Sequence, residues 1–189
     1  PINPVATDFI RRGIETAKEK QAVCLLIRLN TPGGLLKSTR VIVGDILNSP
    51  VPVIVYVSPS GAHAGSAGVF ITMAAHLAVM APGTNIGAAH PVTTQGEMDT
   101  IMSAKATNDA MAFIRSIAKK RERNANWGAQ AVSNSVSLTE TEALENNVIN
   151  LIAASDQELL NKINGKNITV SSGTVTLQTQ HATVQSLEM

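Results

Sequence analysis

The stretch AGSAG, residues 64–68, places one serine between small residues, just ahead of a long apolar run. The run predicts a buried helix, so Ser66 stands where a helix begins, and the positive end of a helix stabilises negative charge nearby. The spacing resembles the nucleophile elbow of serine hydrolases, although Ala64 stands where that motif has glycine. A hydroxyl here suits a nucleophile, but taken alone it is more simply interpreted as the cap of the helix.

A second turn of small residues, NTPGG at residues 30–34, follows a continuous aliphatic run. Gly33 and Gly34 permit close backbone approach, and N–H groups at the start of the next helix could receive an oxyanion. The turn is not a phosphate loop, because the Gly-Lys-Ser/Thr ending is absent. In a parallel sheet the carboxyl ends of neighbouring strands meet at one edge, where ligands usually bind. We therefore expect the glycine turn and Ser66 to face each other.

A serine nucleophile needs a base to take its proton. The chain offers His63, His76, His90, His181 and Lys105. His76 falls in the apolar run and is interpreted as a core residue. Lys105 lies between two alanines at the expected head of an amphipathic helix. Burial there would disfavour its charged form and make it a base, although a solvated lysine is the simpler interpretation of these residues alone.

The elements that must position these residues alternate between aliphatic runs and helical periodicities. Strands are expected at residues 22–30 and 52–58, and a strand followed by a loop within 84–92. Helices are expected at 8–20, 35–49, 66–80, 105–120 and in SLTETEALENNVIN and SDQELLNKI. The last part of the apolar 66–80 run, HLAVMAPG, could form a short strand instead of continuing the helix. A basic cluster at 119–123 ends one helix, where cations suit that helix's dipole. Because the strands are apolar on both faces, the pattern predicts an α/β fold with a parallel sheet covered by helices.

Composition limits the classes of function. The 189 residues carry a net charge of +1, which argues against a nucleic-acid surface. One cysteine, Cys24, excludes an internal disulfide framework, and no His or Cys cluster has metal-ligand spacing, so no metal or other cofactor is expected. Aromatic residues make up only 3%, so the core must be aliphatic. The abrupt opening, PINPVATDFI, is typical of a piece of a longer protein.

Several stretches together resemble one family. LNTPGG, AGSAG, APGTNIGAAHPV, KATNDAMAFIRSIAKKRERN and SLTETEALENNVIN occur in the order found in the NfeD-type membrane serine proteases, the stomatin-operon partner proteases. These are similar to the Clp protease and signal peptide peptidase A. The resemblance covers roughly residues 8–163 and implies a Clp/crotonase-like fold. We expect a protease domain at residues 1–165 and a β-rich C-terminal tail at 166–189 that leads toward a missing membrane region.

The resemblance also implies roles for particular residues. Ser66 matches the nucleophile and Lys105 the general base of a Ser–Lys dyad, while Gly34 and the amide of Ala67 match the oxyanion donors and Gly33 shapes the turn. The family cleaves hydrophobic segments, including those of a stomatin-like membrane partner. Related proteins are dimeric, so a homodimer or larger oligomer is expected. The full-length protein is expected at the membrane with its protease domain extracytoplasmic, and this fragment is expected to be soluble.

Alternatives stay open at this point. His90, in AAHPV, resembles the histidine of the Clp triad and is a rival base, although no aspartate stands at an obvious orienting position. A non-catalytic scaffold could bind a stomatin-like protein through the same groove. An acyl-CoA enzyme of the crotonase type would use the glycine donors but leave Ser66 and Lys105 unexplained. The loop at residues 93–104 is polar at its start and is expected to be poorly ordered without substrate.

Overall fold

A parallel sheet forms the centre of the molecule. The computed structural model describes residues 1–92 and 99–188. Four strands run in the order β1-β2-β4-β7, and all three neighbouring pairs are parallel. Their bounds are β1 (Leu25–Leu29), β2 (Val53–Val57), β4 (Leu77–Met80) and β7 (Leu151–Ile152). Every residue of β2 and β4 is buried, as expected for central strands covered on both faces.

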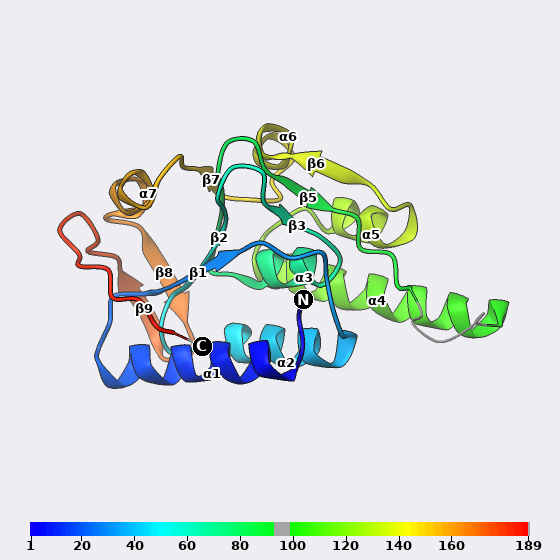
Figure 1. Cartoon of the computed structure of the whole chain (residues 1–189), viewed down its shortest axis with the longest axis horizontal. Coiled ribbons are helices and arrows are strands. Elements are labelled where there is room, and N and C mark those ends of the chain that lie inside the picture. The colour runs from blue at the N-terminus through cyan, green and yellow to red at the C-terminus, as the bar shows by residue number, and fades with distance from the viewer. Residues whose placement is uncertain (93–98, 189) are drawn as a thin grey trace.

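Helices cover the two faces of this sheet unequally (Figure 1). The helices are α1 (Pro4–Glu19), α2 (Leu36–Leu47), α3 (Ala67–Ala74), α4 (Thr100–Lys120), α5 (Ala125–Ser133), α6 (Glu140–Glu145) and α7 (Asp156–Ile163). Alternate strand residues point to opposite faces. Val53, Val55 and Val57 join the larger core cluster with α1 to α5, whereas Ile54 and Tyr56 join a smaller cluster with α7. The predicted α/β architecture is therefore confirmed.

Two smaller sheets flank the main one. The first holds β3 (His63–Ala64), β5 (Asn85–Gly87) and β6 (Ser137–Thr139) in the order β3-β5-β6. The second is the hairpin of β8 (Asn167–Val170) and β9 (Gly173–Thr176). The hairpin packs Ile168 and Val170 into the smaller core cluster, and the chain then runs back to α1 (Figure 1). The boundary expected near residue 165 stays a prediction.

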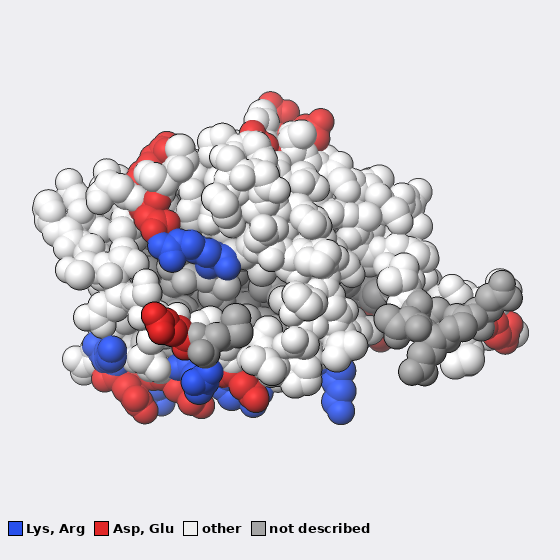
Figure 2. Space-filling view, viewed as in Figure 1, with Lys and Arg blue, Asp and Glu red and all other residues white. Residues whose placement is uncertain are grey.

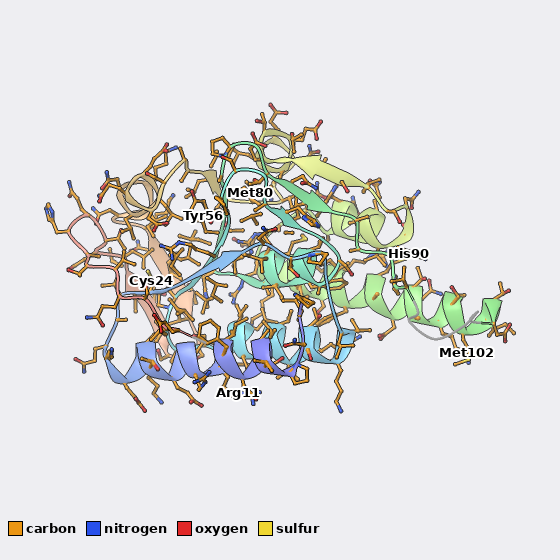
Figure 3. The ribbon with its side chains drawn as sticks, viewed as in Figure 1. Arg11, Cys24, Tyr56, Met80, His90 and Met102 are labelled. Atoms are coloured by element: carbon orange, nitrogen blue, oxygen red, sulfur yellow. The ribbon has the colours of Figure 1, made fainter. Side chains whose placement is uncertain are left out.

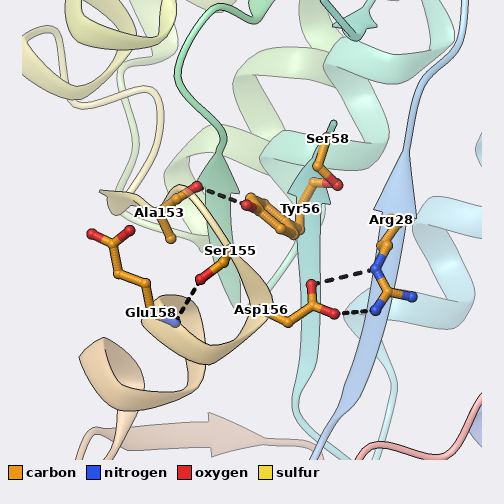
Figure 4. Close-up of polar contacts among 7 residues, drawn as sticks. All are labelled: Arg28, Tyr56, Ser58, Ala153, Ser155, Asp156 and Glu158. Atoms are coloured by element: carbon orange, nitrogen blue, oxygen red, sulfur yellow. Dashed lines mark hydrogen bonds and ion pairs between the residues drawn. The ribbon is translucent and has the colours of Figure 1, made fainter. Parts of the chain in front are cut away.

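Helix α7 is fastened to the sheet by polar contacts that Figure 4 shows in close-up. The Tyr56 hydroxyl donates to the Ala153 carbonyl over 2.7 Å, and Arg28 pairs with Asp156 at the start of the helix. The Ser155 hydroxyl accepts the Glu158 N–H over 3.2 Å, which is an ordinary N-cap. Charged side chains gather along α1 in Figure 2, whereas most of the rest of that face carries none. This distribution fits an amphipathic α1 that buries Ile10 and Ile14.

The helix expected over residues 66–80 is shorter than that. Helix α3 ends at Ala74, and the short strand that this end allowed is β4. The chain turns at Ala75, and the next residue exchanges hydrogen bonds with β2: His76 N–H donates to the Val53 carbonyl, and Val53 N–H donates to His76 Nδ1. A run that is apolar on every side cannot distinguish helix from strand, so long-range pairing decided the boundary. His76 consequently lies in a turn and not inside a helix.

Candidate active site

Strand β3 brings the glycine turn and the serine together. Thr31 N–H donates to the His63 carbonyl over 2.9 Å, and Gly65 N–H donates to the Thr31 carbonyl over 2.9 Å. As a result, a Cβ added to Gly33 would lie 2.7 Å from Ser66 Cβ and 3.2 Å from Ser66 Oγ. Gly33 also has φ +128°, which strains any residue with a side chain. The glycine turn and Ser66 are therefore in direct contact.

Ser66 itself has a backbone that serine rarely adopts. Its φ of 48° and ψ of −109° lie outside the regions that residues with a Cβ prefer. The residue occupies the N-cap position of α3, but its side chain makes no cap hydrogen bond, so the interpretation of the hydroxyl as a cap is wrong. Its N–H donates to the Ala88 carbonyl over 2.7 Å, which ties the serine to the segment after β5. The hydroxyl is thus presented on a strained strand-to-helix turn.

The family resemblance assigned the backbone N–H groups of Gly34 and Ala67 as oxyanion donors. The peptide bond between Gly33 and Gly34 is trans, so its carbonyl and its N–H point in opposite directions. The carbonyl of Gly33 accepts the Ile2 N–H over 2.8 Å, which turns the Gly34 N–H away from Ile2. The N–H of Ala67 belongs to the first turn of α3, where helices leave donors unpaired. Neither N–H has an acceptor within residues 1–92 and 99–188, and their role as oxyanion donors stays a prediction.

His90 lies beside α5 (Figure 3). It is two residues after Ala88, whose carbonyl accepts the Ser66 N–H. Its Nδ1 is 2.8 Å from the Val132 carbonyl, and a carbonyl only accepts hydrogen bonds, so Nδ1 carries the proton. In the neutral ring Nε2 is then an acceptor. The backbone carbonyl of Val132 thereby orients the imidazole. In a Ser–His–Asp triad an aspartate has this role, and the sequence offered no obvious aspartate for it.

Among the described residues, no hydrogen bond joins Lys105 to Ser66. The first half of α4 projects beyond the body of the molecule, and Met102 marks this end in Figure 3. Lys105 is exposed on this half, and the core-facing side of the helix begins only at Ala110. The helix begins at Thr100, earlier than expected, so residues 100–104 are helical. The remainder of the loop that was expected to be poorly ordered, residues 93–98, lies outside the described residues.

Two other candidate groups are excluded by burial. Desolvation, and then the neighbouring Arg121, lower the pKa of His76 to about 4, and the ring lies in a turn of the core. Burial raises the pKa of the Cys24 thiol to about 11, so it is a poor nucleophile. His63 was among the candidate bases, and its ring lies beside the glycine that precedes Ser66: a Cβ at Gly65 would lie 2.9 Å from His63 Nε2. The spacing HAGS could have indicated this proximity to Ser66.

Comparisons with known proteins show the family to which this chain belongs. The family profile described as "NfeD1b, N-terminal domain" matches residues 2–186. The membrane-bound protease PH1510 of Pyrococcus horikoshii is 40% identical over 184 residues, which are 95% of this chain and 42% of that protein. The membrane protein NfeD1b of Bacillus subtilis is 31% identical over 145 residues, covering 77% of this chain and 32% of that protein. The chain thus spans less than half the length of the curated relatives it matches.

Solved structures extend the likeness. A serine-to-alanine mutant of the 1510-N membrane-bound stomatin-specific protease superposes with a TM-score of 0.90 at 36% identity, over 100% of this chain and 93% of that one. A lysine-to-alanine mutant of the same protease, in complex with a substrate peptide, matches equally well over 88% of its length. ClpP1 of Listeria monocytogenes, 17% identical over 82% of this chain and 87% of its own, gives a TM-score of 0.65 and shows a shared Clp-like fold alone. The chain belongs to the family of NfeD1b N-terminal domains.

Proposed function

We propose that this chain is the catalytic domain of a serine endopeptidase in which Ser66 is the nucleophile. The observation that carries the proposal is the strained Ser66 backbone, packed against Gly33 and followed by the N–H of Ala67 at the start of α3, which is unpaired within the described residues. Strain of this kind persists only where surrounding structure holds it, and it clusters at active sites. A scaffold that only bound a partner would not need it.

The reaction is acyl transfer in two halves. Ser66 Oγ attacks the carbonyl carbon of the peptide while a base takes the hydroxyl proton, and the N–H groups of Gly34 and Ala67 hold the oxyanion. The C–N bond then breaks, and the leaving amine takes the proton from the base. Water, deprotonated by the same base, attacks the acyl ester and frees Ser66. The balance needs no cofactor.

For the base we favour Lys105, which matches the family's lysine. The related 1510-N protease with bound substrate peptide is a lysine-to-alanine mutant, which is consistent with this choice. The first half of α4 stands clear of the body, so Lys105 must approach Ser66 by a change in this segment; catalytic contacts often form only with substrate bound. His90 is the second candidate, because the Val132 carbonyl already leaves its Nε2 as an acceptor.

The substrate we propose is an apolar segment of a stomatin-like membrane protein, following the stomatin-specific relatives. Leu35 and Leu36, directly after the oxyanion turn, are 53% and 40% exposed and could contact such a segment. We further propose a homodimer or larger assembly that covers Ile101 and Met102, which are exposed on α4. No helix within the described residues has the length and apolarity to span a bilayer. Following the membrane-bound relatives, we also propose that the full-length protein is attached to the membrane, with this domain on its outer side.

Labelling with a fluorophosphonate probe tests the function directly. The wild type should gain one phosphonyl group, mapped by mass spectrometry to Ser66, and Ser66→Ala should gain none. Labelling that is absent from the wild type would favour the scaffold. An adduct elsewhere would make Ser66 the wrong nucleophile. Light scattering at micromolar concentration separately tests the oligomer, because a monomer there would contradict it.

Paired variants then identify the base. Lys105→Ala and Lys105→Arg should both abolish cleavage, because guanidinium stays charged and cannot accept the proton. His90→Ala should cost far less. Loss of activity in His90→Ala, with activity kept in Lys105→Ala, would transfer the role to His90.

A further inference from the structure

Thr31 is a buried residue that contacts three segments of the proposed site. It is 2% exposed, and it lies in the glycine turn, two residues after β1. Its hydroxyl contacts the turn, its backbone pairs with β3, and its methyl packs on α3. The nucleophile and the oxyanion donors are carried by these same three segments.

The hydroxyl contact closes a small ring with Gly33. Gly33 N–H donates to Thr31 Oγ1 over 3.1 Å, and Thr31 Oγ1 donates to the Gly33 carbonyl over 3.1 Å. Side-chain turns of this kind fix the local backbone. The Gly33 carbonyl therefore has two donors, since it also accepts the N–H of Ile2.

This ring controls the direction of the Gly34 N–H. The Gly33 carbonyl and the Gly34 N–H belong to one planar trans peptide, so a group that fixes the carbonyl also aims the N–H on its far side. Hydrogen bonds to the carbonyl further polarise the amide and strengthen its N–H as a donor. Thr31 supplies one of the two donors that fix this plane.

The remaining contacts of Thr31 fix the nucleophile relative to that plane. Its N–H and carbonyl pair with His63 and Gly65, immediately before Ser66. Its γ-methyl faces Gly68 in the first turn of α3, where an added Cβ would lie only 2.9 Å away. One residue thus sets the distance between the donor on the turn and the serine at the helix start.

We propose that Thr31 is a positioning residue that aims the Gly34 N–H at the oxyanion. The inference rests on the proposed peptidase function, and it assigns to the threonine hydroxyl a role in the rate of acylation and not in substrate binding. The γ-methyl, by contrast, contributes packing. The two groups on one Cβ can therefore be separated by substitution.

Thr31→Val and Thr31→Ser provide the matched test. Valine keeps the methyl and removes the hydroxyl, whereas serine keeps the hydroxyl and removes the methyl. The measurement is the rate of fluorophosphonate labelling at Ser66 against probe concentration, together with Tm. We expect Thr31→Val to lower the maximal labelling rate about 10- to 100-fold, with half-saturation within about threefold of wild type. Thr31→Ser should label within about threefold of wild type despite a lower Tm.

Several results would overturn the inference. Labelling of Thr31→Val at the wild-type rate would do so, as would equal losses in the valine and serine variants or losses that follow Tm. If valine prevents folding, Thr31→Ala removes the hydroxyl without crowding the turn and should show the same loss of rate as expected for valine. Failure of the wild type to label would instead count against the peptidase function itself.

Nuclear magnetic resonance gives a readout that is independent of activity. The amide resonances of Gly33 and Gly34 should be similar in wild type and Thr31→Ser, and should move in Thr31→Val as the ring opens. Unchanged resonances in Thr31→Val would overturn the positioning role even in an active enzyme.

Discussion

The two ends of α3 are built in opposite ways. At its start, Ser66 has a strained backbone, and the first helical N–H, that of Ala67, has no acceptor in the described part of the chain. At its end, three consecutive carbonyls are each bound by an arginine. Arg123 donates to Met73 over 2.9 Å and to Ala75 over 2.8 Å, and Arg121 donates to Ala74 over 2.8 Å.

The difference shows how a short helix can hold an open, strained start. Eight residues form a marginal helix on their own, so α3 depends on contacts with the rest of the fold. Arg123 also donates to Asn150 Oδ1 over 2.6 Å, and the same oxygen accepts the N–H of Ala78 in β4. The cationic end complements the helix dipole, and the open end keeps its N–H groups for an anion. One end supplies stability and the other supplies chemistry.

Removing the hydroxyl at the open end should have the largest effect. Ser66→Ala should lower peptide cleavage by at least about 10³-fold, because the acyl-enzyme cannot form. Its Tm should stay within a few degrees of wild type, because the hydroxyl makes no cap bond that folding would lose. Cleavage assays and thermal melts measured on one preparation check both. Activity close to wild type would remove the basis for calling this end catalytic.

Breaking the closed end should instead affect stability. Arg123→Met removes three charge-assisted hydrogen bonds from a buried site, so we expect unfolding to become easier by about 3–5 kcal/mol. Arg121→Met removes one such bond and should cost about 1.5–3 kcal/mol. Urea unfolding gives these values.

Arg115→Met is the matched control for this pair. Arg115 is exposed on α4, so its loss should change the free energy of unfolding by less than about 0.5 kcal/mol. If Arg123→Met were as stable as Arg115→Met, the bonds at the end of α3 would not be what holds the helix.

The sequence indicated the sheet better than the elements that build the site. The aliphatic runs of β1 and β2 and the periodicity of α4 are long enough to give clear patterns. Strand β3 has two residues, which is too few for any periodicity, yet it joins the glycine turn to Ser66. Its existence depends on pairing with β5 and on one bridge to Thr31, which no local pattern encodes.

The basic cluster illustrates the same limit. Residues 119–123 were interpreted as cations that suit the end of their own helix, and Lys119 and Lys120 do lie in the last turn of α4. Arg121 and Arg123 instead bind the end of α3, almost 50 residues earlier in the chain. Motif resemblance supplied candidate catalytic residues such as Lys105, but only the folded structure shows which candidates are in contact. In this structure Gly33 contacts Ser66, whereas Lys105 is exposed on the projecting half of α4.

Acid should lower the free energy of unfolding through the protonation of His76, which lies just after the end of α3. The pKa of His76 falls to about 4 in the folded chain, through desolvation and then Arg121, against 6.5 for the free side chain. As pH falls, the unfolded state therefore binds the proton first, and stability declines from pH 6.5 toward pH 4. The expected loss between pH 7 and pH 5 is about 2 kcal/mol. Urea unfolding at these two pH values measures it.

His76→Asn provides the comparison, since the asparagine oxygen can accept the Val53 N–H as Nδ1 does. The variant should lose much less stability than wild type over the same interval. Parallel losses in the two proteins would mean that other groups cause the acid sensitivity.

The smallest effect should come from relieving strain at the open end. Ser66 and Ser155 both precede a helix, but Ser66 has φ 48° and no cap bond, whereas Ser155 has φ −151° and caps the N–H of Glu158. Glycine tolerates positive φ, so Ser66→Gly should raise the free energy of unfolding by about 1 kcal/mol while abolishing cleavage. Ser155→Gly loses a cap and should lower it by a few tenths of a kcal/mol. Urea unfolding of both variants measures the two changes in the free energy of unfolding, which should have opposite signs. A destabilised Ser66→Gly would show that the serine backbone is not strained.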